Sequence, residues 1–204
     1  KAIALGAAVL EQASQLPGVV SVGLSANGAP LTHNGNTTWI RILGRPWDGG
    51  HIDVPEREVT PAWFSTIGAK LASGRFFTES DDSTKGGVAI VNQAFVRKHF
   101  NNGEAVGQNI GRVSIKTDPV EIVGVVEDIR QGSLDDEIPP IVYRPFKQNT
   151  DTFFNLVART SQDPGALIPE LTAAIRRIDP EILTLDPATM QDRLERSNAA
   201  YMHR

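Results

Sequence analysis

The first third of the chain carries apolar residues at the spacings of short helices and strands. Helical spacing over residues 1–16 predicts an amphipathic helix, and Pro17-Gly18 ends it. Period-two patterns then predict strands, and Thr60-Pro61 has the residue types that cap and begin a helix. The predicted strands are 19–24, 38–43 and 52–59, and the helix after Thr60 is expected to turn Trp63, Phe64, Ile67 and Leu71 toward the core.

The middle of the chain has the pattern of a small unit of its own. Strands are predicted at 88–91, 113–115 and 120–126. Asn92 has the side chain of a helix cap, and Thr117-Asp118-Pro119 has the composition of a hairpin turn. Asp- and Gly-rich sequence precedes this segment and Pro139-Pro140 follows it, which favours a boundary on each side.

The last third has a strand–helix–strand order. Strands are predicted at 153–159 and 182–185, and a polar helix is predicted from about 187 to 204. Between the strands, a helix is expected to begin at Asp163-Pro164 and to end at Asp179-Pro180. Pro169 lies inside this helix, where it is expected to kink the helix or to delay its start.

These elements predict an α+β fold with two lobes. Residues 1–83 and 138–204 are expected to form a split β-α-β lobe, and residues 84–137 a smaller α+β lobe inserted into it. The helices over 1–16 and 187–204 have only thin apolar stripes, so we expect them to lie side by side on one face.

Composition excludes several classes of function. The 20 Lys and Arg against 24 Asp and Glu give a net charge of −4, which argues against a nucleic-acid partner because such partners require a concentrated basic face. The chain has no cysteine, so it has neither disulfides nor thiolate metal ligands. No apolar run approaches the roughly 20 residues of a membrane helix.

The residues that could carry chemistry do not form a recognisable catalytic pattern. His33, His51, His99 and His203 are scattered, without the paired spacing of a zinc site. Ser25 follows a strand as a catalytic nucleophile would, but the second glycine of a nucleophile elbow is missing. The segment 107–111 lacks the residues of a phosphate loop and is interpreted as a turn before a strand.

Two acidic clusters, 79–82 and 135–137, have carboxylates but not the spacing of a calcium loop. They are interpreted as solvated loops, and Asn36 begins a glycosylation sequon by pattern alone. Arg75 is expected to bind Asp81 or Asp82 and so to close its loop. The sequence therefore predicts no catalytic residue, no cofactor-binding residue and no metal ligand.

Seven segments in chain order together resemble the MacB-like periplasmic core domain of ABC-type permeases, a family that includes the FtsX-like proteins. They are LPGVVSV (16–22), VTPAWFSTIG (59–68), LASGRFFT (71–78), VAIVNQAF (88–95), AVGQNI (105–110), EIVGVVEDIR (121–130) and IVYRP (141–145). Ala105 and Gln108 depart from the pattern, which more often has proline and lysine there.

This resemblance implies an extracytoplasmic domain between two transmembrane helices of an ABC transporter permease, at the bacterial inner membrane. It implies a membrane-proximal lobe, often called Porter, and an inserted lobe, often called Sabre. It also implies mechanotransmission: a separate ATPase subunit or domain moves the lobes, and the permease can pair as a dimer. Neither enzymatic activity nor a cofactor is implied.

Two alternatives stay open at this point. One is a sensor domain that binds a small molecule between the two lobes, and the other is a hydrolase with dispersed catalytic residues near Ser25 or Asp82. The transported substrate follows from neither the pattern nor the resemblance.

Overall fold

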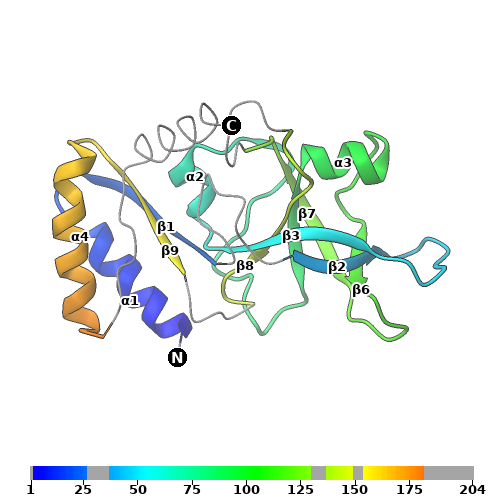
Figure 1. The fold of residues 1–204 in the computed structure, drawn as a ribbon, viewed down its shortest axis with the longest axis horizontal. Helices are drawn as coiled ribbons and strands as arrows, with labels where there is room; N and C mark the ends of the chain where they lie inside the picture. Colours follow the sequence, from blue (N-terminus) through cyan, green and yellow to red (C-terminus); the bar gives the residue numbers. More distant parts are fainter. Residues whose placement is uncertain (1, 27–36, 130–136, 149–153, 182–204) are drawn as a thin grey trace, which may run out of the picture.

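The computed structural model describes residues 2–26, 37–129, 137–148 and 154–181, which form a mixed α+β fold (Figure 1). The described helices are α1 (Ala2–Ser14), α2 (Trp63–Ile67), α3 (Gln93–Phe100) and α4 (Pro164–Ile178). The described strands are β1 (Val19–Ala26), β2 (Thr37–Ile42), β3 (Ile52–Val59), β4 (Leu71–Gly74), β5 (Val88–Asn92), β6 (Asn109–Arg112), β7 (Val120–Val126), β8 (Val142–Pro145) and β9 (Asn155–Thr160).

Six strands form a closed ring, which we call the barrel. They pair in the order β2-β6-β7-β5-β8-β3, and β3 pairs with β2 to complete the circle. The pairs β5–β7 and β3–β8 are parallel, and the others in the ring are antiparallel. Alternate residues face inward and form one apolar core, which includes Ile42, Val54, Val91 and Ile122.

Helix α3 closes one end of the barrel. Asn92 caps it, since its side chain accepts a hydrogen bond from the Phe95 backbone N–H at 3.1 Å. Phe95 is fully buried in the barrel core, and Val96 and Phe100 pack beside it. The opposite end of the barrel has no such helix among the described elements.

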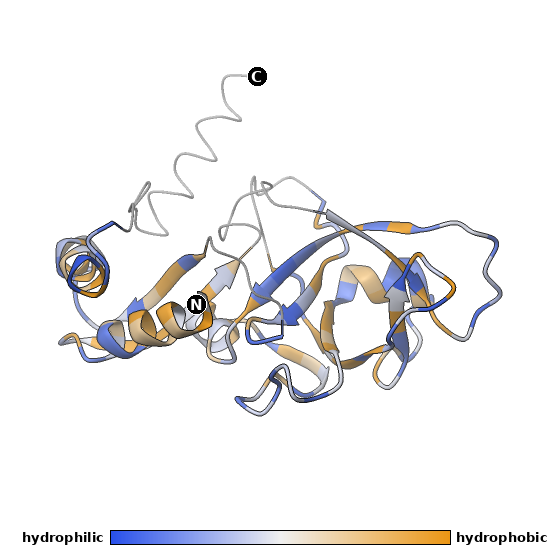
Figure 2. Ribbon diagram, turned by 90° about the horizontal axis from the view of Figure 1, so that it is seen from below, coloured by the Kyte–Doolittle hydropathy of each residue, from blue (hydrophilic) through white to orange (hydrophobic). Residues whose placement is uncertain are grey.

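Strands β1 and β9 form a two-stranded antiparallel ribbon beside the barrel, joined to it by β1–β3 pairing at Ser25↔Val59 and Ala26↔Glu58. Helices α1 and α4 pack against each other and cover one face of the ribbon. On α1, Gly6, Val9 and Ala13 are buried at helical spacing, as an amphipathic helix requires. We call α1, α4, β1 and β9 the ribbon unit; it lies at one end of the long axis, and the barrel lies at the other (Figures 1 and 2).

The predicted α+β class is confirmed, and so are several element ends. Asp163 caps α4 by accepting from the Gly165 N–H, and the helix ends at Ile178 before Asp179-Pro180. Pro169 does not delay the helix, which begins at Pro164 and contains Pro169 within it. The predictions for 182–185 and 187–204, and the side-by-side placement of the terminal helices, lie outside the described residues.

Two predicted elements are wrong in position. The strand predicted at 113–115 is β6 at Asn109–Arg112, because Ile110 is buried in the barrel whereas Ile115 is 88% exposed in the following loop. Leu71 is not on the helix after Thr60: α2 ends at Ile67, its C-cap Gly68 has the left-handed φ of 78° that glycine favours, and Leu71 begins β4.

Hydrogen bonding crosses the predicted lobe boundaries. Strands β5 and β7 of the segment 84–137 pair with β8 and β4, which lie outside that segment, and β6 pairs with β2. The division into 1–83 with 138–204 and 84–137 therefore does not coincide with a break in strand pairing, and as a description of moving parts it stays a prediction.

Candidate functional site

The region where the ribbon unit meets the barrel holds close contacts between distant parts of the chain. We call it the junction: it consists of the middle of β1, the segment Thr60 to Gly68 that contains α2, and Arg159 of β9. Helix α2 packs on the ribbon face opposite α1 and α4 (Figure 1). Its residues come from one of the segments that carry the family resemblance.

Gly23 on β1 allows the backbones to approach. A Cβ atom at this position would lie 2.5 Å from the Trp63 Cα atom and 2.9 Å from the Trp63 backbone nitrogen. Carbon atoms in normal contact are about 3.5–4.0 Å apart, so only glycine fits here. A glycine inside a strand commonly marks such a close approach.

Thr60 joins the same two elements by hydrogen bonds on both sides of Leu24. The Leu24 N–H donates to the Thr60 hydroxyl at 2.9 Å, and the Thr60 N–H donates to the Leu24 carbonyl at 3.0 Å. The prediction that Thr60 caps the helix is therefore wrong: the N-cap residue is Ala62, without a side-chain cap, because the Thr60 hydroxyl binds a strand 36 residues away.

Strand β9 is held to α2 by a charged side chain. The Arg159 guanidinium donates from Nε to the Thr66 carbonyl at 3.1 Å. That carbonyl lies in the last turn of a short helix, where a positive charge is favourable. Both strands of the ribbon are therefore attached to α2.

An aromatic cluster attaches α2 to the barrel. The ring centroids of Trp63 and Phe64 lie 5.8 and 5.2 Å from that of Tyr143 on β8. Phe64 also contacts Phe76 and Phe77, at 5.1 and 6.0 Å. Phe64 and Tyr143 are fully buried and Trp63 is nearly so. These rings therefore fill the space between the ribbon unit and the barrel and pack the two together.

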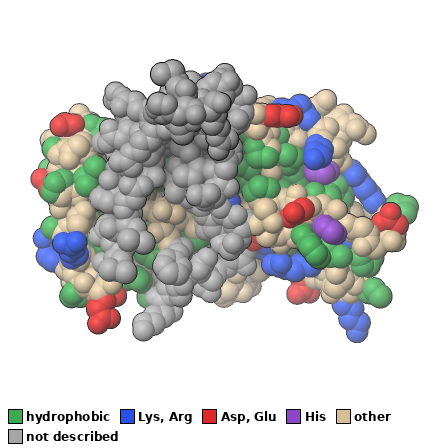
Figure 3. All heavy atoms as spheres, viewed as in Figure 1, with side chains coloured by type: hydrophobic (Ala, Val, Ile, Leu, Met, Phe, Trp, Pro, Cys, Tyr) green, Lys and Arg blue, Asp and Glu red, His purple; other side chains and the backbone are tan. Residues whose placement is uncertain are grey.

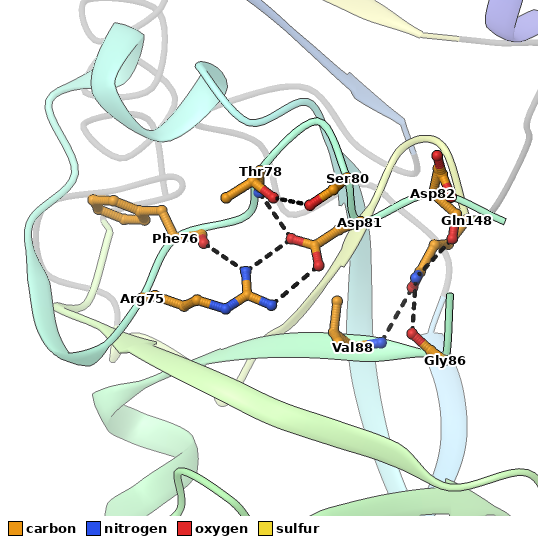
Figure 4. Close-up of polar contacts among 9 residues, drawn as sticks. All are labelled: Arg75, Phe76, Thr78, Ser80, Asp81, Asp82, Gly86, Val88 and Gln148. Atoms are coloured by element: carbon orange, nitrogen blue, oxygen red, sulfur yellow. Dashed lines mark hydrogen bonds and ion pairs between the residues drawn. The ribbon is translucent and has the colours of Figure 1, made fainter. Parts of the chain in front are cut away.

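The loop that carries Phe76 and Phe77 is fixed by a bidentate ion pair (Figure 4). Arg75 Nη1 and Nη2 lie 2.9 and 3.1 Å from the two carboxylate oxygens of Asp81, and the Thr78 N–H donates to Asp81 at 2.8 Å. Burial alone would raise the pKa of Asp81, but the hydrogen bonds from Arg75 and Thr78, with the charge of Arg75, outweigh it and lower the pKa. The predicted loop closure by Arg75 is confirmed, with Asp81 as its partner.

The glycine before this arginine has a backbone role. Gly74 has a φ of 73°, and a Cβ there would lie 2.2 Å from the Val123 carbonyl oxygen of β7. The start of the loop is therefore pressed against the barrel by its backbone. At the other end, Gln148 binds the Asp82 and Gly86 carbonyls and the Val88 N–H (Figure 4).

The other predicted candidates are far from one another. Ser25 is fully buried within β1, and so it is not at an exposed strand-to-helix turn. His51 stacks on Trp39 at 4.1 Å, and His99 packs on Phe95, where burial and nearby positive charges lower its pKa. His33, His203, Asn36 and Asp135 lie outside the described residues.

The remaining polar candidates serve local structure. Gly107 has a φ of 88° and begins the turn that leads into β6, as predicted for 107–111. Asp82 accepts hydrogen bonds from the backbone and hydroxyl of Thr84, which lower its pKa. Within the described ranges no three His, Asp or Glu side chains come together as metal ligands, and no helix is long and apolar enough to cross a membrane.

The surface charge of the described part agrees with the composition. On the face drawn in Figure 3, Lys and Arg side chains stand among Asp and Glu side chains and do not merge into one basic area.

Comparison with known proteins identifies the family. A family model described as the MacB-like periplasmic core domain matches residues 2–178. No curated protein matches the chain in sequence.

Three solved structures share the fold. The periplasmic region of MacB from Actinobacillus actinomycetemcomitans has a TM-score of 0.61 and 15% identity over 85% of this chain and 73% of that one. The extracellular domain of the noncanonic ABC-type transporter YknZ from Gram-positive bacteria has a TM-score of 0.56 and 16% identity, covering 83% and 79%. A domain of a putative permease from Porphyromonas gingivalis has a TM-score of 0.55 and 17% identity, covering 88% and 85%.

Proposed function

Because the chain belongs to the family of MacB-like periplasmic core domains, we propose that it is a mechanical link in the extracytoplasmic part of an ABC transporter permease. In this proposal the domain lies between two transmembrane helices of its permease, and a separate ATPase subunit or domain supplies the energy. A second copy of the permease is a further proposed partner. The domain has no catalytic step of its own.

The junction is the observation that carries this proposal. The described chain has two structural units, the ribbon unit and the barrel, and we propose that these are the parts that move in the permease. The junction joins them through the two residue pairs of β1 and β3 and through the segment of α2, which is bonded to β1 by Thr60 and to β9 by Arg159. Phe146, after β8, packs on α1 and β1 as a further contact.

The contact between β1 and α2 at Gly23 suits transmission of movement because backbone atoms make it. Gly23 brings the β1 backbone against that of Trp63, so no flexible side chain separates them. The rings of Trp63 and Phe64 on α2 in turn pack on the ring of Tyr143 on β8 of the barrel. Close-packed interiors have low compressibility, and a displacement of the ribbon unit therefore reaches the barrel with little loss.

The test uses two fluorescent reporters, one on each side of the junction, in the full permease with its ATPase. The 204 residues have no cysteine, so in a permease and ATPase otherwise freed of cysteine two single variants, Ala173→Cys on α4 and Ile115→Cys beyond β6, report separately; both positions are exposed. Addition of ATP is expected to change both signals in the otherwise unchanged protein. In Thr60→Val, the α4 signal is expected to change as before and the barrel signal to lose most of its response.

Thr60→Ser is the matched control, since it keeps the hydroxyl that accepts from Leu24. It is expected to retain the barrel response. A barrel signal that responds fully in Thr60→Val and Arg159→Gln alike would overturn the proposal, because movement would then bypass the junction.

A further inference from the structure

The open end of the barrel contains a pocket of about 330 Å³. It lies away from the junction, inside the ring of strands and not between the two units. Ile40, Ile110 and Val142 are buried side chains at its base, and Thr38, Arg112 and Arg144 lie at its rim. Strands β2, β6 and β8 thus each supply one apolar residue and one polar residue.

The alternation of strand residues explains this arrangement. Ile40 and Arg112 are register partners on β2 and β6, while Val142 and Arg144 are two positions apart on one strand and so face the same side. Ile40, Ile110 and Val142 belong to the apolar core that also contains Phe95 of α3, whereas Thr38, Arg112 and Arg144 lie two positions away from them on the same strands. The barrel therefore changes from a filled core to a polar mouth along its axis.

Basic side chains outnumber acidic ones around this mouth. The charged lining residues are Glu56, Arg112, Lys116, Asp118 and Arg144. Arg144 is held in place by its Nε, which donates to the Val88 carbonyl at 3.0 Å. Burial lowers the pKa of Arg144; the negative charges of Glu56 and Glu58 oppose this effect, and the positive charge of Arg112 acts in the same direction as burial.

We propose that this pocket binds a small organic anion, with its carboxylate or phosphate between Arg112 and Arg144 and its apolar part on the base. Guanidinium groups bind such anions through charge-assisted hydrogen bonds. The volume is at the small end of ligand pockets, which limits the occupant to a short molecule. This site is independent of the proposed mechanical role.

The test titrates the 204-residue chain, labelled with ¹⁵N, with four probes of six carbons each: hexanoate, hexyl phosphate, hexanol and hexylammonium. Hexanoate and hexyl phosphate are expected to shift the amide signals of β2, β6 and β8 and to bind at least about tenfold more tightly than hexanol. Hexylammonium is expected to bind more weakly still. The tighter of the two anions identifies whether the natural ligand carries a carboxylate or a phosphate.

Two variants test the pocket itself. Arg112→Gln removes an exposed rim charge and is expected to weaken anion binding roughly tenfold, whereas Arg177→Gln on α4 leaves it unchanged. Thr38→Phe places a ring in the mouth and is expected to abolish binding of all four probes, with an otherwise folded spectrum. Equal binding of hexanoate and hexanol, no binding by any probe, or full anion binding by Arg112→Gln would each overturn the proposal.

Discussion

A single methyl group at Gly23 tests whether the backbones of β1 and α2 must touch. In Gly23→Ala the new Cβ lies 2.5 Å from Trp63 Cα and 2.9 Å from Trp63 Cβ. Reaching a normal contact distance of about 3.5 Å requires the two elements to separate by about 1 Å. Because two of the three nearest atoms belong to the backbone, no change of rotamer relieves the contact.

The separation has a calculable effect on stability. It stretches the paired hydrogen bonds between Leu24 and Thr60, which are 2.9 and 3.0 Å long. Overpacking of a filled interior costs about 1–3 kcal/mol, and alanine gains back only about 0.4–1 kcal/mol through the unfolded chain. We therefore expect Gly23→Ala to lower the free energy of unfolding by about 1–2 kcal/mol.

Urea unfolding of the chain, followed by tryptophan fluorescence, measures this change, since Trp63 is buried at the contact. Gly86→Ala is the matched control: its added Cβ has no atom within 4 Å and its φ is not in the left-handed region. The control is expected to be as stable as the unmodified chain or slightly more so. If Gly23→Ala unfolds at the same urea concentration as Gly86→Ala, the backbones of β1 and α2 are not in close contact at the junction.

Three further changes probe local features. The pKa of Asp81 is lower in the folded state than in the unfolded state, so Asp81 stabilises the fold fully above its unfolded pKa of about 4, and this stabilisation is lost as the pH falls through the folded pKa. Asp81→Asn should therefore flatten the acid side of a curve of unfolding free energy against pH. An unchanged acid side would contradict this. Asn92→Ala removes the acceptor of the Phe95 and Ile141 N–H groups in a fully buried site, and calorimetry should find about 2–3 kcal/mol less stability. Burial lowers the pKa of His99 in the folded state, so as the pH drops this histidine takes up a proton in the unfolded chain before it does so in the folded chain. The free energy of unfolding should therefore fall as the pH drops through about 6.5, and His99→Gln should remove this pH dependence. If the dependence persists in His99→Gln, another group causes it.

Features that depend on residues close in sequence could be predicted. Asn92 and Asp163 are caps because their side chains reach N–H groups two or three residues away. The bond between Arg75 and Asp81 spans only six residues. The family could also be recognised, since its seven segments occur in order, and the family model confirms it.

Features that depend on distant residues could not be predicted. Thr60 has the composition of a cap, but its hydroxyl is used by Leu24, and nothing near Thr60 in the sequence indicates that partner. Gly23 could have been noticed as a glycine inside a strand pattern, yet its neighbour Trp63 lies 40 positions further along. Nothing in the sequence indicated that Arg159 would bind α2, because a charged residue near the end of a strand is common.

The sequence by itself determined most of the elements, the caps at Asn92 and Asp163, and the family, because side-chain type and period-two or helical spacing act over a few residues. Only the tertiary structure decided that β2 pairs with both β3 and β6 and so closes a barrel. A period-two pattern selects which face of a strand is buried but not which strand lies beside it, and several strands here have similar patterns. The partner is chosen by the packing of the whole core, and the junction and the pocket at the barrel mouth both result from that choice.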